Sequence, residues 1–159
     1  MVFVNRPKID TCYTVQGMTY SPSRLYSLEV HEDAEDDLDD LYEKDEDAAA
    51  DIDVFLQEVK GSQEMMDNLT RNGYVHHGEG ASFNVAEWQK TKLSKYNLWR
   101  VRLLYLAGAS NYRIVYAFHA GEYRYYVLAV LHRDFNYDPN HERTKRILAL
   151  YDSLDIPRY

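Results

Sequence analysis

Three arginines fall in two neighbouring segments that have the composition of β-strands. Arg100 and Arg102 lie in "LWRVRLL" (98–104), and Arg113 lies in "NYRIVYAF" (111–118). Because side chains alternate between the two faces of a strand, Arg100 and Arg102 point to the same face. Arg113 shares its face with residues that otherwise look buried, and a cation there requires a counter-charge or a function. Guanidinium groups present forked donors that match phosphate oxygens, so these residues predict a phosphate site.

A third strand-like segment, "LAVLHRDFNY" (128–137), ends in groups that could act on a phosphate. His132 and Arg133 are adjacent, and Tyr137 follows in the same loop. The polar residues after His132 indicate that the strand ends there, so we expect His132 and Arg133 both to turn toward the rim that carries the arginines. An imidazole titrates near neutral pH, whereas a guanidinium stays protonated. His132 is therefore the expected general base, with His119 as a reserve.

Each of these residues also has a purely structural interpretation. Arg100 and Arg102 suit the solvent-facing side of a sheet. Arg113 suits a salt bridge to one of the acidic helices, which offer many partners. His132 alone suits an ordinary strand end. The residue pattern by itself leaves these alternatives open.

Other polar clusters favour structural roles. The acidic run 32–53 carries its carboxylates opposite a regular apolar stripe, without the glycine-containing loop of a calcium site, and indicates a solvated helix surface. His76 and His77 are adjacent and would face apart in a strand, which disfavours a metal pair. Cys12 is the only cysteine, so no intramolecular disulfide can form. We therefore expect neither a metal nor a cofactor.

The spacing of apolar residues predicts the elements that position these side chains. Residues 25–30 alternate as in a strand, and residues 32–60 follow helical spacing that we expect to break in "EKDED" (43–47), with Asp45 or Asp47 capping a second helix. A short helix is expected near 65–70, and the glycine-rich segment of about 71–95 is expected to be an inserted loop. Strands at 98–106, 112–118 and 123–131 form an antiparallel meander before a closing helix. The prediction is an α+β domain: an antiparallel sheet of one N-terminal strand plus the meander, with a helical hairpin and a C-terminal helix packed on one face of the sheet.

Composition limits the domain organisation and the compartment. A chain of 159 residues that is 45% hydrophobic suffices for one domain, expected at 25–155 after an irregular extension at 1–24. No apolar run approaches the roughly 20 residues of a membrane span, and the start lacks a signal-peptide core, so we expect a cytoplasmic protein without a membrane partner.

The net charge of -8 conceals a division: residues 1–87 carry six Lys and Arg against twenty Asp and Glu, whereas residues 88–159 carry twelve against six. Attraction of RNA is expected to depend on the basic second half.

Taken in order, "LWRVRLL", "NYRIVYAF" and "VLAVLHRDFNY" resemble the RelE/ParE superfamily of bacterial toxins. In that superfamily a basic strand, a strand of pattern YR-apolar-apolar-Y and a strand ending in HRxxxY succeed one another. The resemblance covers about residues 25–155 and leaves out 1–24 and the 71–95 loop. It implies a compact RelE-like toxin of a type II toxin-antitoxin system, inhibited by a cognate antitoxin. RelE-like members cut messenger RNA, usually on the ribosome, and ParE-like members poison DNA gyrase.

The resemblance also implies roles for individual residues. It places Arg113 at the central phosphate contact, Arg133 and Tyr137 at the terminal pair, and His132 at a histidine found in many members. Arg100 and Arg102 take the basic-strand positions, and Lys95 and His119 are expected among the RNA or phosphate contacts. Metal-free cleavage by the 2'-hydroxyl requires a proton acceptor, charge stabilisation on phosphorus and protonation of the leaving 5'-oxygen.

Two departures from the family pattern keep alternatives open. Family toxins are usually basic, whereas this chain is acidic, and some relatives have lysines where this chain has arginines. A ParE-like gyrase inhibitor that acts by binding, or a non-catalytic family member, therefore remains an alternative to the endoribonuclease.

Overall fold

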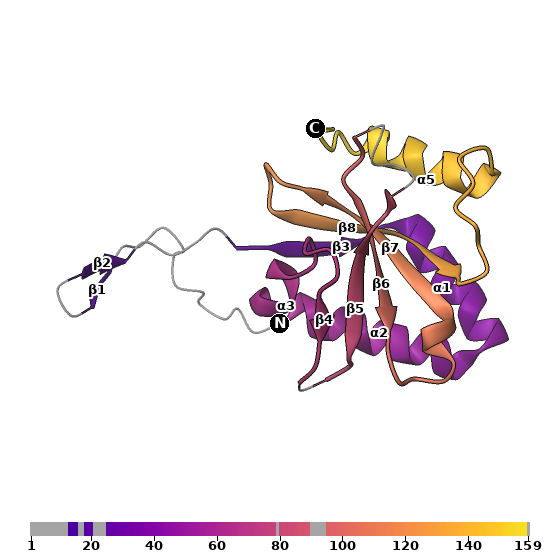
Figure 1. Ribbon diagram of the computed structural model, residues 1–159, viewed down its shortest axis with the longest axis horizontal. Helices are drawn as coiled ribbons and strands as arrows, with labels where there is room; N and C mark the ends of the chain where they lie inside the picture. The colour runs from indigo at the N-terminus through magenta and orange to yellow at the C-terminus, as the bar shows by residue number, and fades with distance from the viewer. Residues whose placement is uncertain (1–12, 16–17, 21–24, 79, 90–94, 159) are drawn as a thin grey trace, which may run out of the picture.

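The computed structural model describes residues 13–15, 18–20, 25–78, 80–89 and 95–158 of the chain. Figure 1 shows the order of the elements. Along the chain they are β1 (Tyr13–Val15), β2 (Met18–Tyr20), β3 (Ser27–Val30), α1 (Glu32–Lys44), α2 (Glu46–Lys60), α3 (Gln63–Asp67), β4 (Val75–His76), β5 (Phe83–Glu87), β6 (Leu98–Leu103), the short 3₁₀ helix η1 (Ala109–Asn111), β7 (Tyr112–His119), β8 (Arg124–His132) and α5 (Glu142–Ser153). β1 and β2 pair antiparallel as a separate two-stranded sheet, so part of the expected irregular extension is β-structure.

Within the described residues the main sheet has six strands, in the order β3-β8-β7-β6-β5-β4. Each neighbouring pair is antiparallel except β3 and β8, which are parallel. The predicted α+β class is confirmed, but the prediction of a wholly antiparallel sheet is wrong at β3. The prediction of a loop at 71–95 is also wrong, because this segment contributes β4 and β5 to the sheet.

The helical hairpin has the predicted break. Asp45 ends α1 and precedes α2, and its carboxylate accepts a hydrogen bond from the N–H of Ala48 at 3.1 Å. The same residue's N–H donates to the carbonyl of Leu41 at 2.7 Å. One aspartate therefore closes the first helix and caps the second.

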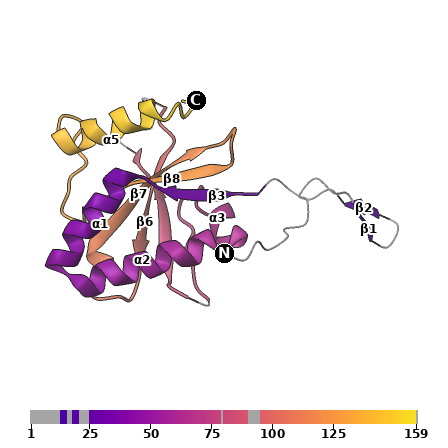
Figure 2. The same ribbon diagram turned by 180° about the vertical axis from the view of Figure 1, so that it is seen from behind.

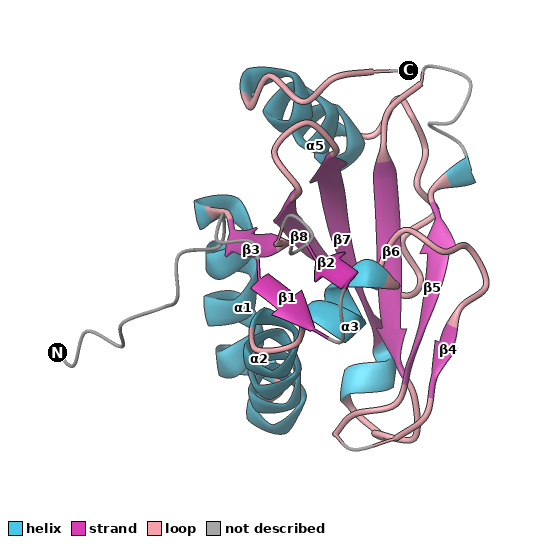
Figure 3. Ribbon diagram, turned by 90° about the vertical axis from the view of Figure 1, so that its left-hand side faces the viewer, coloured by secondary structure: helices cyan, strands magenta, loops and turns pink. Residues whose placement is uncertain are grey.

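The two faces of the sheet bury separate cores. α1, α2 and α3 cover one face, against residues such as Val101, Ile114 and Val127. Figures 2 and 3 show α1 and α2 lying together on this side of the sheet. α5 packs against the other face, where Ile147 and Tyr151 join the alternate residues of β7 and β8. Helices thus lie on both faces, not on one as the sequence predicts.

A β-bulge at Leu128 changes which residues of β8 face each core. Val115 pairs with Ala129 and Tyr116 pairs with Val127, so Leu128 has no residue opposite it. Leu128 and Ala129 consequently both join the core beneath α5. Beyond the bulge the alternation is shifted by one residue, and Val130 faces the α1 side.

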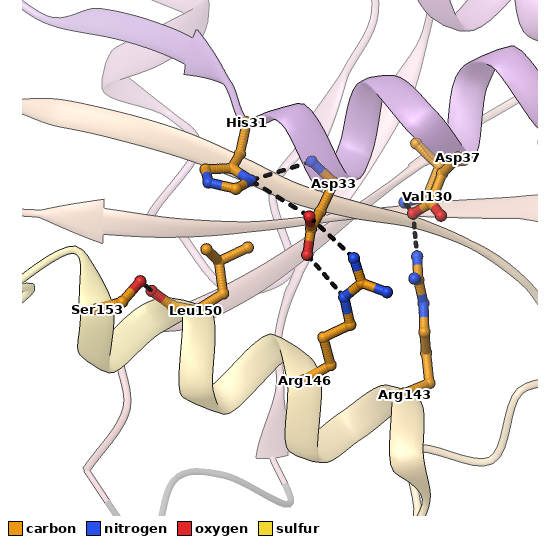
Figure 4. Close-up of polar contacts among 8 residues, drawn as sticks. All are labelled: His31, Asp33, Asp37, Val130, Arg143, Arg146, Leu150 and Ser153. Carbon is orange, nitrogen blue, oxygen red and sulfur yellow. Dashed lines mark hydrogen bonds and ion pairs between the residues drawn. The ribbon is translucent and has the colours of Figure 1, made fainter.

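Two arginine–aspartate contacts connect α5 to α1 (Figure 4). Arg146 binds both oxygens of Asp33 at 2.9 and 3.1 Å, and Arg143 binds Asp37. Asp37 also accepts the N–H of Val130 at 2.9 Å, on a part of β8 that lies beyond its pairing with β3. The bond to Arg146 lowers the pKa of Asp33, whereas burial raises the pKa of Asp37 against the opposing effects of Val130 and Arg143. The carboxylate of Asp37 therefore accepts hydrogen bonds both from the edge of β8 and from an arginine of α5.

Gly80 is expected to be the less replaceable of two glycines near α2. Its φ is +83°, and an added Cβ would lie 2.6 Å from a carboxylate oxygen of Glu58, which also accepts the N–H of Ala81. We expect Gly80→Ala to lower the free energy of unfolding by about 1–2 kcal/mol. The control is Gly61→Ala, because Gly61 has φ -86° and no atom nearer than 3.6 Å to the added Cβ. Urea unfolding of both variants tests the prediction, and equal losses would contradict it.

Candidate functional site

Three arginines lie on the β5–β6–β7 part of the face that α5 packs against. Arg100 pairs across the ladder with Ala86 and Val115, and Arg102 pairs with Asn84. We call Arg100, Arg102 and Arg113 the arginine face. Together with Asn84 and Ala86 they line a hollow of about 120 Å³. The structure therefore brings together the three arginines that the strand pattern predicted to be neighbours.

Arg113 is held by carbonyls and repelled by its neighbours. Its guanidinium donates to the carbonyls of Ser110 and Tyr112 at 3.0 and 3.1 Å. Within the described residues none of the ion pairs includes Arg113, and the acidic helices lie across the sheet from it. Burial lowers the pKa of Arg113, and the charges of Arg102, Arg100 and Arg133 lower it further, while Tyr137 opposes them. The predicted alternative of a salt bridge to the helices is not realised within this part of the chain.

Among the described residues, two polar atoms beside the hollow are buried without a hydrogen-bond partner there. They are Nε of Arg102 and the hydroxyl oxygen of Tyr137. Buried polar atoms in folded proteins nearly always have partners, so each exception requires an explanation. A bound anion or a water molecule would supply acceptors to both.

Tyr137 is fixed next to the arginines by aromatic contacts. It has a positive φ of 56°, and its buried ring lies 5.0 Å from Trp88 and 5.3 Å from Phe135, centroid to centroid. The guanidinium carbon of Arg100 lies 5.3 Å from the centre of the same ring, within cation–π range. The structure therefore places Tyr137 against Arg100 of the arginine face.

His132 lies on the opposite face of the sheet from the arginines. β8 continues to His132, which pairs with Tyr112, whereas Arg113 pairs with Leu131. Its ring packs 5.3 Å from that of Tyr112, and Nδ1 accepts the N–H of Asp134 at 3.2 Å. His132 lines a separate hollow of about 380 Å³ with α1 residues including Asp40 and Lys44. The expectation that His132 turns to the arginine rim is therefore wrong, because the bulge at Leu128 reverses the face of this position.

The bulge at Leu128, which turns His132 away from the arginine face, turns Arg133 toward it. Alternation along β8 puts the position after His132 on the face of Leu131 and Arg113. The N–H of Arg133 extends the ladder by donating to the carbonyl of Asn111 at 2.7 Å, and its charge acts on Arg113. Arg133 is exposed and forms the rim of the site.

His119 and Lys95 are not brought to the arginine face. His119 ends β7 opposite Arg124, six residues from Arg113 or roughly 20 Å along the strand. Its Nδ1 accepts the N–H of Glu122 at 3.2 Å. Lys95 is exposed ahead of β6 with a φ of 62°, and the described lining of the arginine hollow does not include it.

β5 contributes site residues that the sequence prediction missed. Asn84 and Ala86 line the arginine hollow, and Trp88 packs on Tyr137. The signal was present, because Phe83 and Val85 alternate with Asn84 and Ala86, but the glycines upstream favoured a loop. Recognition of this alternation would have predicted the strand and the face on which Asn84 lies.

The described residues contain neither a cluster of metal ligands nor a membrane-spanning helix. No group of three or more His, Cys, Asp and Glu side chains there could hold a metal ion. Within the same ranges, every helix is too short or too polar to cross a membrane. Comparisons with family models, curated proteins and solved structures gave no match for this chain.

Proposed function

We propose that the arginine face binds the phosphodiester backbone of RNA and that the protein is an RNA-cleaving toxin of the RelE type, inhibited by a cognate antitoxin. The observation that carries this proposal is the grouping of Arg100, Arg102 and Arg113 on one sheet face with no ion-pair partner for Arg113 in the described residues. Like charges this close raise the energy of the unliganded protein, and an anion bound among them lowers it. The order of the strand motifs supports RNA as the source of that anion.

The charge distribution supports a defined orientation on RNA. The carboxylates of α1 and α2 lie on the other side of the sheet from the arginines. A polyanion is repelled by the helices and attracted to the arginine face, so the net charge of -8 does not prevent binding at one face. We expect affinity to fall steeply as salt concentration rises.

The proposed reaction transfers the phosphoryl group within the RNA. The 2'-oxygen bonds to the adjacent phosphorus, and the bond from phosphorus to the 5'-oxygen breaks. The products are a 2',3'-cyclic phosphate and a 5'-hydroxyl, so the proton lost by the 2'-oxygen is balanced by one gained at the 5'-oxygen. Arg113 and Arg102 stabilise the negative charge that develops on the phosphoryl oxygens. Guanidiniums are poor proton acceptors, so we assign proton exchange to the hydroxyl of Tyr137.

Binding without cleavage is the second candidate function. Its favouring observation is the lining of the arginine hollow, which includes neither a histidine nor a carboxylate among the described residues. A ParE-like gyrase inhibitor or a non-catalytic binding module fits the same face. Induction in cells separates the candidates: mapping of transcript ends reports cleavage, whereas DNA damage with intact messenger RNA reports gyrase inhibition. Purified protein that binds RNA without producing cyclic phosphate ends would overturn the cleavage proposal.

Replacement of Tyr137 and of His132 tests which residue exchanges the proton. Tyr137→Phe keeps the ring and removes the hydroxyl, and we expect a roughly 100-fold or larger loss of the cleavage rate with RNA affinity nearly unchanged. His132→Ala is expected to cleave at the wild-type rate, because His132 lies across the sheet from the arginines. Single-turnover cleavage measures both variants. Loss of cleavage in His132→Ala alone would restore the histidine as the base.

A further inference from the structure

A second hollow adjoins the arginine face and shares Arg100 with it. Its other lining residues are Glu87, Trp88 and Gln89, from β5 and the positions after it, and Tyr137. We call this hollow the β5 pocket. Its volume is about 160 Å³. That space suits one flat ring system.

The walls of the β5 pocket are flat and mostly apolar. Trp88 and Tyr137 meet edge to face, and the planar guanidinium of Arg100 lies over the tyrosine ring. Aromatic rings and guanidinium planes are the surfaces on which unpaired bases stack. Gln89 and Glu87 also line the pocket, and Gln89 is exposed, so its amide can reach the edge of a bound ring.

The shared arginine restricts the ligand to one that has an anion and a ring close together. Arg100 lines both hollows, with Arg102 and Arg113 on one side and Trp88 and Tyr137 on the other. A free phosphate fills only the first hollow, and a neutral aromatic compound fills only the second. A nucleotide presents a phosphate and a base at adjoining positions and engages both.

We infer that the β5 pocket binds one unpaired nucleobase of the RNA whose phosphate lies on the arginine face. This inference rests on the proposed RNA function and adds to it a base-binding subsite. Most of that subsite comes from Glu87, Trp88 and Gln89, which belong to the 71–95 segment outside the toxin-like motifs. The protein therefore contacts a base as well as the backbone.

Comparison of two oligonucleotides tests the base pocket on the unmodified protein. One is a short single-stranded 2'-O-methyl RNA, which lacks the nucleophilic hydroxyl and cannot be cleaved. The other has the same length and phosphates but carries no bases. We expect the base-containing strand to bind about tenfold tighter at one fixed salt concentration, as one base stacking on protein aromatics provides. We also expect only that strand to quench the tryptophan fluorescence.

The outcomes distinguish the pocket from the proposed function. Equal affinity and no quenching overturn the base pocket and leave phosphate binding intact. Failure of both strands to bind overturns the proposed function and the pocket with it. Trp88→Phe keeps an aromatic ring but removes the fluorescence of Trp88. If the base-containing strand still binds this variant tenfold tighter and quenches its remaining tryptophan fluorescence as in the wild type, Trp88 is rejected as a wall of the pocket.

Substitutions test which residues cause the preference for the base-containing strand. Trp88→Ala is expected to abolish the tenfold preference while keeping the affinity for the strand without bases, and Gln89→Ala is expected to weaken only the base-containing strand. Because Trp88 is buried, circular dichroism must show that its variant folds, and the exposed Gln89 provides a variant that does not perturb the core. Tyr42→Ala is the control, since Tyr42 is an aromatic on α1 across the sheet. An equal loss of preference in Tyr42→Ala would overturn the assignment.

Discussion

Arg113→Ala is expected to abolish growth arrest and to weaken RNA binding roughly 30-fold or more, while the variant folds at least as stably as the wild type. A charge-assisted hydrogen bond to a phosphate contributes about 2–3 kcal/mol, which converts to this loss of affinity. Stability is retained because the folded wild-type protein holds Arg113 partly buried beside other guanidiniums, and burial together with these charges lowers the pKa of Arg113. Removal of one cation relieves that repulsion, although two hydrogen bonds to carbonyls are lost.

Matched variants separate this effect from a general loss of positive charge. Arg124→Ala removes an arginine at the start of β8, whereas Arg113 pairs with Leu131 near the end of that strand. Arg124 forms ion pairs with Glu29 and Glu122 at 3.9 and 4.0 Å. Arg124→Ala is expected to remain toxic and to bind RNA normally. Arg113→Lys keeps the charge without the fork and is expected to recover part of the affinity. RNA-binding titrations and thermal unfolding measure both properties, and a stable, fully toxic Arg113→Ala protein would reject the site.

Asp37→Ala is expected to lower the free energy of unfolding by about 2–3 kcal/mol. The substitution leaves two partners without their acceptor: the guanidinium of Arg143 and the N–H of Val130. The Val130 N–H lies on a strand edge that no neighbouring strand covers in the described residues, so no other backbone acceptor replaces the carboxylate. Both losses affect the attachment of α1 and α5 to β8 (Figure 4).

Denaturant unfolding measures this loss against an exposed carboxylate on the same helix. Asp39→Ala removes such a carboxylate and is expected to change stability by less than about 0.5 kcal/mol. A double-mutant cycle with Arg143→Ala isolates the ion pair, and the remaining loss in Asp37→Ala reports the Val130 hydrogen bond. Equal effects of the Asp37 and Asp39 substitutions would show that the carboxylate does not support the strand edge.

The arrangement of charge connects stability with the proposed function. The carboxylates of α1 that point to α5 are paired with arginines, whereas the arginines of β6 and β7 are grouped together. The protein thus neutralises charge where helices are joined and concentrates it where we propose that RNA binds. Grouped cations reduce the stability of the unliganded protein, and a ligand that neutralises them restores it. RNA binding should therefore raise the midpoint of thermal unfolding.

Local patterns in the sequence determined much of the fold. The apolar spacing of 32–60 and the capping chemistry of Asp45 specify a helical hairpin with its break, since both act within a few residues of chain. Strands β6, β7 and β8 and the shared face of Arg100 and Arg102 follow from alternation in the same way. These features depend on the geometry of short chain segments, so the order of residues within each segment predicts them.

Tertiary structure alone decided which chemical groups meet. Pairing of β5 with β6 brings Asn84 and Trp88 to the arginines, and the parallel pairing of β3 with β8 joins segments separated by most of the chain. The one-residue bulge at Leu128 puts His132 on the α1 side and Arg133 on the arginine side. Strand register and bulges arise from hydrogen bonds to a distant partner strand, so alternation within one segment cannot predict them. The sequence therefore determined which strands carry the arginines of the proposed phosphate site, whereas the register of β8 removed the expected histidine from it.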